Sequence, residues 1–235
     1  MKSFFRYLLS VAMLSLTTFV CKGGAAESEA SPELVPPVVV RAIGEGNAAF
    51  AAQDYKQAKT SYEFALKVKP DNVLTLVNLG LTEFYLKNYD DAEKRLFEAL
   101  KQDIKTGAAW MVLGMIYMEQ TKRQEALAAF SNAVLYEPEN ARAHNFLGVT
   151  IGEIGWYEGA EAEFRKAIAL DSKYVDAHFN LAYFCMRRRT PAVELARRHY
   201  QKALQLGGAS DAELEKQFAA ADKKLSEQNT AVKTP

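Results

Sequence analysis

The chain has 235 residues, and its 29 basic side chains are balanced by 29 acidic ones. This balance does not favour a nucleic-acid partner, because proteins that bind nucleic acid usually carry a basic excess. Two cysteines and three histidines are few for a disulfide framework or a metal site, and we expect no cofactor.

The first 26 residues are predicted to be a secretory signal peptide. Two cations precede an apolar run over residues 7–20, and small residues up to Ala26 offer a cleavage point. The run is short for a membrane span, and a retained signal anchor is an alternative. Lipidation of Cys21 is another alternative, although the preceding Val20 is not small. The mass of the mature protein distinguishes cleavage near Ala26 from an acylated Cys21.

Export would place the protein in the periplasm or outside the cell. Cleavage would leave Cys185 as the one cysteine, and 26 basic against 29 acidic side chains. Contact with a membrane is expected only if the signal is retained or Cys21 is lipidated. Residues 27–38 contain three prolines and are predicted to be an extended linker.

Residues 39–209 repeat with a period of 34 residues. Small residues recur in three columns: Gly46, Gly80, Gly114, Gly148 and Ala182; Ala58, Ala92, Ala126 and Ala160; and Ala65, Ala99, Ala133, Ala167 and Ala203. A two-residue insertion shifts the end of the last unit. Such a period indicates stacked repeats, because one unit cannot bury its own apolar face. We predict five units, near 39–72, 73–106, 107–140, 141–174 and 175–209.

Each unit is predicted to form two packed helices. Gly114 and Ala126 are small enough for the two helices to approach closely, and Phe130 fills the space beside that contact. Pro138 ends the second helix of its unit. No segment alternates with the period of two that is typical of a strand. We therefore predict an all-α fold with ten helices in the repeats.

The C-terminal segment is predicted to cover the last repeat. Residues 210–213, Ser-Asp-Ala-Glu, match a capping box. An apolar stripe follows at helical spacing, formed by Leu214, Phe218, Ala221 and Leu225. A solenoid needs such a helix over its last apolar face, and we predict a capping helix over residues 210–227. Residues 228–235 are polar and are predicted to be a disordered tail.

The middle unit matches a known repeat at eight positions, which are Trp110, Leu113, Gly114, Tyr117, Ala126, Phe130, Ala133 and Pro138. This stretch closely resembles the tetratricopeptide repeat, and the resemblance extends over roughly residues 39–208. It implies a right-handed helix-turn-helix solenoid. It also implies a protein that is not an enzyme but a scaffold for protein–protein interactions, here in the cell envelope or outside the cell.

The resemblance further implies that an unknown protein or peptide binds in a concave groove lined by the first helix of each unit. The predicted partner-binding residues are Ile43, Phe50, Val77, Leu81, Phe84, Met111, Met115, Met118, Arg142, Asn145, Asn180 and Tyr183. Family members that grip a terminal carboxylate use asparagines and cations. Asn47 and Asn78 match those asparagines, but apolar residues replace the cations, so we exclude such a clamp. An apolar groove with methionines fits a helix or an extended apolar segment.

Three alternatives use other residues. His144, His178 and Cys185 could serve a metal- or heme-handling protein, but both histidines stand where Trp110 stands, which is a packing position. An assembly factor tethered to a membrane through Cys21 is a second alternative. The arginines at 187–189 are predicted to form a solvated turn, or else to contact an anion or an acidic peptide. Thr190 and Pro191 are predicted to cap and start the next helix.

Overall fold

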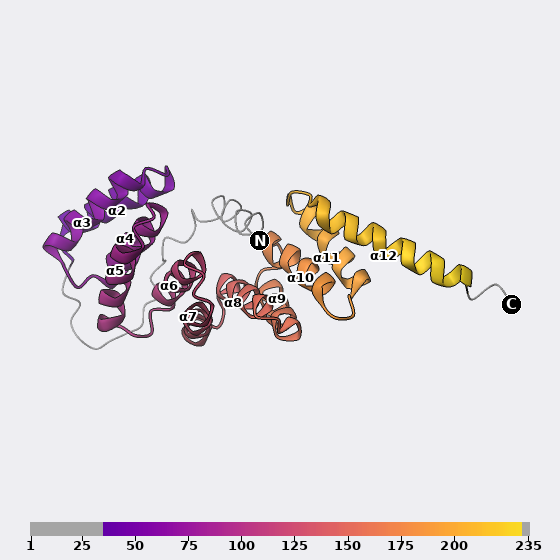
Figure 1. Cartoon of the computed structure of the whole chain (residues 1–235). Coiled ribbons are helices and arrows are strands. Elements are labelled where there is room, and N and C mark those ends of the chain that lie inside the picture. The colour runs from indigo at the N-terminus through magenta and orange to yellow at the C-terminus, as the bar shows by residue number, and fades with distance from the viewer. Residues whose placement is uncertain (1–34, 232–235) are drawn as a thin grey trace. The chain divides into compact units, whose positions relative to one another are not determined.

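The computed structural model describes the backbone of residues 35–231 and the side chains of residues 35–227, so the predicted signal peptide and Cys21 lie outside the described residues. The described residues form eleven helices and no strand (Figure 1). Their bounds are α2 (Pro37–Ala51), α3 (Tyr55–Val68), α4 (Val73–Tyr85), α5 (Tyr89–Gln102), α6 (Gly107–Glu119), α7 (Arg123–Tyr136), α8 (Ala141–Glu153), α9 (Tyr157–Leu170), α10 (Val175–Arg187), α11 (Val193–Gln205) and α12 (Ala212–Ala231). None of them is long and apolar enough to cross a bilayer. The all-α class is confirmed.

The chain divides into two compact units, the first ending at Tyr136 and the second beginning at Glu137. The first unit contains the antiparallel helix pairs α2–α3, α4–α5 and α6–α7, and the second contains α8–α9, α10–α11 and α12. Each pair corresponds to one predicted repeat, which confirms the repeat architecture. Long runs of buried residues occur in the first helix of a pair, as in α4 over 75–84. The second helices bury a single face instead.

The predicted contact between small and bulky residues holds each pair together. An added Cβ on Gly114 would lie 2.6 Å from the ring of Phe130, and one on Gly46 would lie 2.5 Å from the ring of Tyr62. At the equivalent place in the second repeat, Gly80 faces Leu96 at 2.8 Å. A real Cβ does not come so close to another atom. Glycine is therefore required here because the helices touch.

The turn inside each of the first four repeats has one residue with a positive φ. These residues are again 34 positions apart, namely Gln53 (62°), Lys87 (63°), Thr121 (60°) and Gly155 (94°). Side chains disfavour this left-handed conformation, and a β-branched side chain disfavours it most. Thr121 therefore stores backbone strain that Gly155 avoids.

Replacing Thr121 with glycine should stabilise the protein. Relief of the strain is worth about 1 kcal/mol or more, which raises the melting temperature of a chain of this size by about 2–4 °C. Thermal unfolding followed by circular dichroism measures the change. Thr121→Ala should gain less because it keeps a Cβ, and Gly155→Thr should lose stability. A Thr121→Gly variant that melts below the wild type would contradict this account of the turn.

Asparagine and aspartate side chains cap several helices. The Asn72 side chain accepts a hydrogen bond from the Thr75 amide (2.9 Å), and Asn140 caps α8 in the same way. The α12 helix is capped by Asp211, whose carboxylate accepts from the Leu214 amide at 2.7 Å. The prediction that Ser210 is the capping residue was therefore wrong by one position. The helix also runs beyond residue 227, to Ala231.

Candidate functional site

Most of the predicted groove residues of the first unit are buried. Ile43 and Phe50, both on α2, are partly exposed. The other six expose less than a tenth of their surface; they are Val77, Leu81, Phe84, Met111, Met115 and Met118. They come from α4 and α6, which pack against each other. Partner binding by this set stays a prediction.

Aromatic rings gather where α2 and α4 end. The rings of Tyr55 and Tyr85 stack with their centroids 4.9 Å apart and their planes 6° from parallel. Phe50 meets both of them edge-on, at 5.3 and 5.6 Å. Phe84 lies beside Tyr85 at 5.5 Å. Phe50, Tyr55 and Tyr85 are partly exposed, so this aromatic cluster combines a rigid packing arrangement with accessible ring surface.

Three of the predicted groove residues of the second unit, Arg142, Asn145 and Asn180, belong to a polar cluster. The amide of Asn180 donates to the side-chain oxygen of Asn145 at 2.9 Å, and both residues are buried. The amide nitrogen of Asn145 also donates to the Tyr174 hydroxyl at 3.4 Å. Burial raises the pKa of Asp176 to about 6, while the nearby charge of Arg142 opposes that shift. This polar cluster therefore contains hydrogen-bonding groups that are already partly desolvated.

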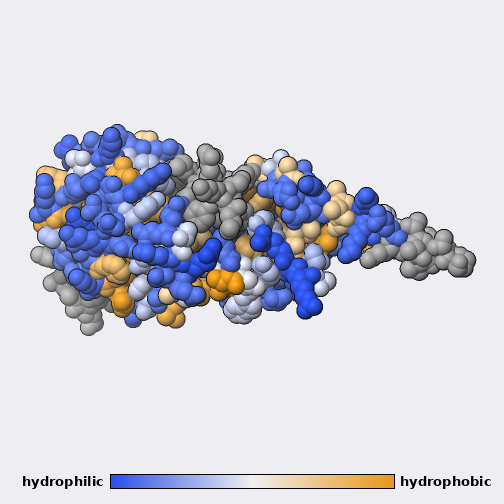
Figure 2. Space-filling view, viewed as in Figure 1, coloured by the Kyte–Doolittle hydropathy of each residue, from blue (hydrophilic) through white to orange (hydrophobic). Residues whose placement is uncertain are grey.

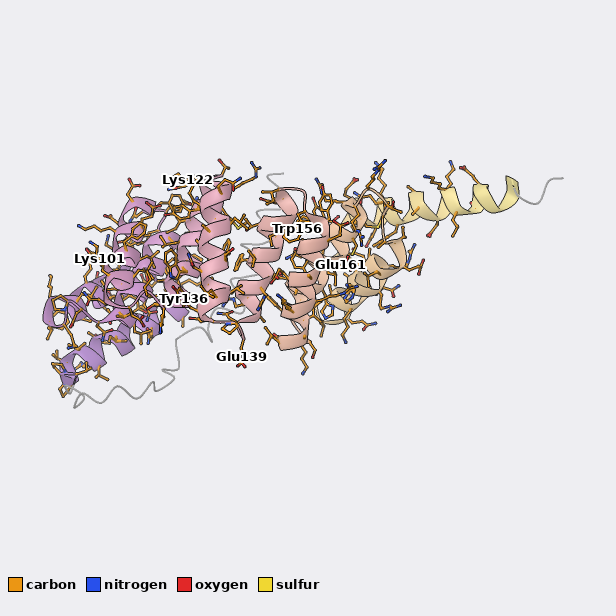
Figure 3. The ribbon with its side chains drawn as sticks, turned by 90° about the horizontal axis from the view of Figure 1, so that it is seen from below. Lys101, Lys122, Tyr136, Glu139, Trp156 and Glu161 are labelled. Carbon is orange, nitrogen blue, oxygen red and sulfur yellow. The ribbon has the colours of Figure 1, made fainter. Side chains whose placement is uncertain are left out.

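The arginines at 187–189 do not form a simple solvated turn. Arg188 makes ion pairs with Glu161 (2.9 Å) and Glu158 (3.3 Å) on α9, and Glu161 is labelled in Figure 3. Arg187 donates to the Tyr183 hydroxyl at 3.1 Å and lies over its ring. Two of the three arginines therefore hold neighbouring structure in place. The prediction of a solvated turn was wrong for Arg188.

The predicted start of α11 was also wrong. The helix begins at Val193, after Ala192, and no side chain caps it. The Ala192 amide donates instead to the Cys185 carbonyl at 3.1 Å. This hydrogen bond ties the segment between α10 and α11 back to the last turn of α10. Thr190 and Pro191 precede this contact and do not cap the helix.

Two histidines occupy the same place in successive repeats and make the same backbone contact. His144 Nε2 lies 2.8 Å from the Pro138 carbonyl oxygen, and His178 Nε2 lies 3.2 Å from that of Ser172. Trp110, one repeat earlier, donates to the carbonyl of Ile104 at 2.8 Å. These carbonyls are also one repeat apart. All three rings therefore anchor the turn that precedes their helix.

The Nδ1 atoms of the two histidines have different partners. His144 Nδ1 lies 2.6 Å from the Glu163 carboxylate, whereas His178 Nδ1 lies 2.8 Å from His199 Nδ1. The 34-residue period does not identify His199, because the two-residue insertion moves it out of register with Glu163. No group of three potential metal ligands occurs among the residues that the structure describes. Burial raises the pKa of the Cys185 thiol to about 11.

The asparagines considered for a carboxylate clamp contact each other. Asn78 donates to the Asn47 side-chain oxygen at 3.3 Å, and the Tyr62 hydroxyl donates to the same oxygen at 2.7 Å. The Asn47 oxygen thus has partners within the first unit, from α3 and α4. This role in packing is compatible with the exclusion of a clamp.

Some large apolar residues are exposed. Ile154 and Trp156 flank Gly155 in the turn between α8 and α9, and Trp156 exposes 60% of its surface (labelled in Figure 3). Its indole packs over Gly159, where a side chain would clash with it. In the view of Figure 2, hydrophilic residues cover much of the described surface and hydrophobic residues form smaller patches. Trp156 does not stand out in the sequence, because exposure of a turn residue is not visible in the repeat pattern.

These features define the class of the protein, which is built from stacked helix-turn-helix repeats. A family model for the tetratricopeptide repeat matches residues 43–109, 111–151 and 153–212. The chain therefore belongs to the tetratricopeptide repeat family. This fold is generally a non-catalytic scaffold for binding proteins or peptides.

The chain matches only part of the length of each relative compared with it. The small glutamine-rich tetratricopeptide repeat-containing protein 2 of Saccharomyces cerevisiae is 34% identical over 97 residues, which is 41% of this chain and 28% of that protein. The BBSome complex member BBS4 of Bos taurus is 26% identical over 122 residues, covering 52% of this chain and 23% of that protein. The chain thus spans less than a third of either relative.

Solved structures match over more of the chain. PilF of Pseudomonas aeruginosa has a TM-score of 0.71 and is 20% identical, covering 83% of this chain and 87% of that one. A thermophilic tetratricopeptide protein of Thermus thermophilus has a TM-score of 0.61 and is 24% identical, covering 78% and 98%. YrrB, a tetratricopeptide protein with an unusual peptide-binding site, has a TM-score of 0.57 and is 19% identical, covering 79% and 92%. At these identities the likeness shows the fold alone.

Proposed function

We propose that the protein is an interaction scaffold that binds a partner polypeptide on the first helices of its repeats. The observation that carries this proposal is the family match over most of residues 43–212, on a fold in which every repeat is a helix pair. Such repeats offer a long series of similar helix surfaces, which suits an elongated ligand. A peptide-binding site in YrrB gives a precedent on this fold.

The two units offer different chemistry to a partner. In the first unit, the aromatic cluster presents flat apolar surface through Phe50, Tyr55 and Tyr85. In the second unit, Arg142 and Tyr183 are partly exposed beside buried asparagines. An apolar or amphipathic segment suits the first surface, and a segment rich in polar groups suits the second. The partner is therefore proposed to be a peptide or helix with an apolar part.

We further propose that the protein acts after export, in the cell envelope or outside the cell. The sequence of residues 1–26 supports this proposal through its cations, its apolar run and the small residues up to Ala26. An envelope assembly factor tethered at Cys21 is the second candidate. It is favoured only by the position of that cysteine at the end of the apolar run.

Partner capture tests the scaffold proposal. We expect Phe50→Ser with Tyr85→Ser to weaken recovery of crosslinked partners from the native envelope by about tenfold, because about 1.4 kcal/mol of apolar contact is lost. Capture should depend little on salt, since apolar contacts are not screened. Tyr183→Ser with Arg142→Gln tests the second unit in the same assay. Serine at Leu81, Met115 or Met118 would not test binding alone, because these predicted groove residues are buried and their loss would disturb packing.

The matched control replaces Arg189 with glutamine and leaves the contacts of Arg187 and Arg188 intact. Arg189 is exposed, so the control should keep its circular dichroism spectrum and its partner. Loss of the partner in this control, with retention in both surface variants, would move the binding site to the inserted segment. Unchanged capture in all three variants would refute binding on these helix surfaces.

A further inference from the structure

The histidine pair of the fifth repeat replaces the histidine–glutamate pair of the fourth. His144 on α8 faces Glu163 on α9, and His178 on α10 faces His199 on α11. Allowing for the two-residue insertion, Glu163 and His199 stand at equivalent positions. The imidazole rings of His178 and His199 are stacked, with centroids 5.1 Å apart and planes 27° apart. The equivalent histidine thus faces a carboxylate in the fourth repeat and a second imidazole in the fifth.

The hydrogen bonds fix where the protons lie in the histidine pair. A carbonyl oxygen only accepts, so His178 Nε2 must carry the proton that it donates to Ser172. In neutral His178 the Nδ1 atom is then an acceptor, and His199 Nδ1 must donate to it across 2.8 Å. One extra proton can be taken up at His199 Nε2, because His199 Nδ1 then still donates to His178 Nδ1. Two extra protons cannot, because both Nδ1 atoms would then be donors facing each other.

The surroundings of His199 oppose even the first proton. Burial, the adjacent His178 and the cations Arg165 on α9 and Arg198 on α11 lower the pKa of His199 to about 4. A base whose pKa falls on folding contributes stability that is present above its ordinary pKa of 6.5. That stability is lost as the pH falls from about 6.5 towards 4, since the unfolded chain then binds the proton more readily.

The surroundings of His178 are more balanced. Burial and the charge of Lys202 on α11 lower its pKa, whereas its bond to the Ser172 carbonyl and the charge of Asp171 raise it, and the lowering effects prevail. The Nδ1 atom of His178 faces a second imidazole, whereas that of His144 in the fourth repeat faces the Glu163 carboxylate.

The α11 helix also holds the C-terminal helix. The Tyr200 hydroxyl donates to Glu215 at 2.8 Å and accepts from the Asp211 amide at 2.7 Å. Arg197 forms an ion pair with Asp222 at 2.7 Å. These three contacts join α11 to α12 and to its capping residue Asp211, so we expect α12 to loosen when α11 moves.

We infer that the α10–α11 pair is an acid-sensitive element, which loosens when its two facing imidazoles take up protons and thereby weakens the hold on α12. The α8–α9 pair has no such pair of facing imidazoles, because His144 faces the Glu163 carboxylate there. The inference is independent of what the scaffold binds.

Hydrogen exchange followed by mass spectrometry on the full chain tests the inference. From pH 7.5 to pH 5, corrected for intrinsic exchange rates, we expect amide protection in α11 and α12 to fall by about tenfold or more. Protection in α5 and α7 should stay within about twofold, because these helices belong to the other unit. His199→Glu reproduces the pairing of the fourth repeat and should keep the protection of α11 within about twofold.

Three results would contradict the inference. Unchanged α11 protection in the wild type at pH 5 would overturn the inference. An equal loss in His199→Glu would also overturn it, because the cause would then lie outside the histidine pair. A loss that extends equally to α5 and α7 would show global rather than local acid sensitivity. If His199→Glu does not fold, His199→Gln takes its place, because glutamine does not titrate and can still hydrogen-bond to His178.

Discussion

A Gly114→Leu variant should be severely destabilised. Even the first side-chain carbon would lie 2.6 Å from the Phe130 ring, and Phe130 is fully buried between its neighbours. Neither helix can move aside cheaply, because α6 also packs against α4 and α5. Overpacking of this kind costs about 3 kcal/mol or more, which lowers the melting temperature by at least about 6 °C. Thermal unfolding followed by circular dichroism measures it.

Gly44 provides a matched control for this substitution. It lies in α2, and an added Cβ there meets no atom within 4 Å. Gly44→Leu should therefore leave stability unchanged or raise it by up to about 1 kcal/mol, since leucine favours helix more than glycine does. If Gly114→Leu melted with the wild type, the helix contact described above would be wrong. A partial rescue by Phe130→Leu, which imitates Gly80 and Leu96, would locate the clash directly.

The repeat pattern was sufficient to predict the fold because it reports packing. A glycine that recurs every 34 residues, opposite a bulky residue, marks the place where two helices touch, as Gly46 does with Tyr62. The number of helices and their pairing follow from that spacing. The left-handed turns are equally periodic, yet three of them have glutamine, lysine or threonine at the residue with a positive φ. No single residue type therefore predicts these turns from the sequence.

Other features depended on contacts between distant residues and could not be predicted. Ser210 and Asp211 are equally good capping residues by composition, but the Tyr200 hydroxyl binds the Asp211 amide and fixes where α12 begins. The partner of His178 was hidden by the insertion that displaces His199. Exposure is also a tertiary property. The apolar pattern of α4 and α6 identified residues such as Leu81 and Met115, and the fold decides how much of them solvent can reach.

Deletion of residues 210–235 should reduce solubility more than it reduces helix content per residue. Leu214 and Phe218 of α12 are buried, and the rings of Phe218 and Tyr200 lie 5.7 Å apart. Without α12, the face of α11 that carries Tyr200 would meet water, and an exposed apolar patch of this kind promotes association. Size-exclusion chromatography with light scattering, together with the soluble fraction on expression, measures the effect.

A shorter deletion distinguishes the effect of losing the apolar face of α12 from the effect of shortening the helix. Removing residues 226–235 keeps Leu214, Phe218 and the ion pair between Arg197 and Asp222. Leu225, the last apolar residue before the cut, exposes 58% of its surface and contributes little burial. The shorter variant should therefore stay monomeric and as soluble as the wild type, whereas the longer deletion should aggregate. If the longer deletion also stayed monomeric and soluble, α12 would be an appendage of the repeats, because the face of α11 would not need a cover.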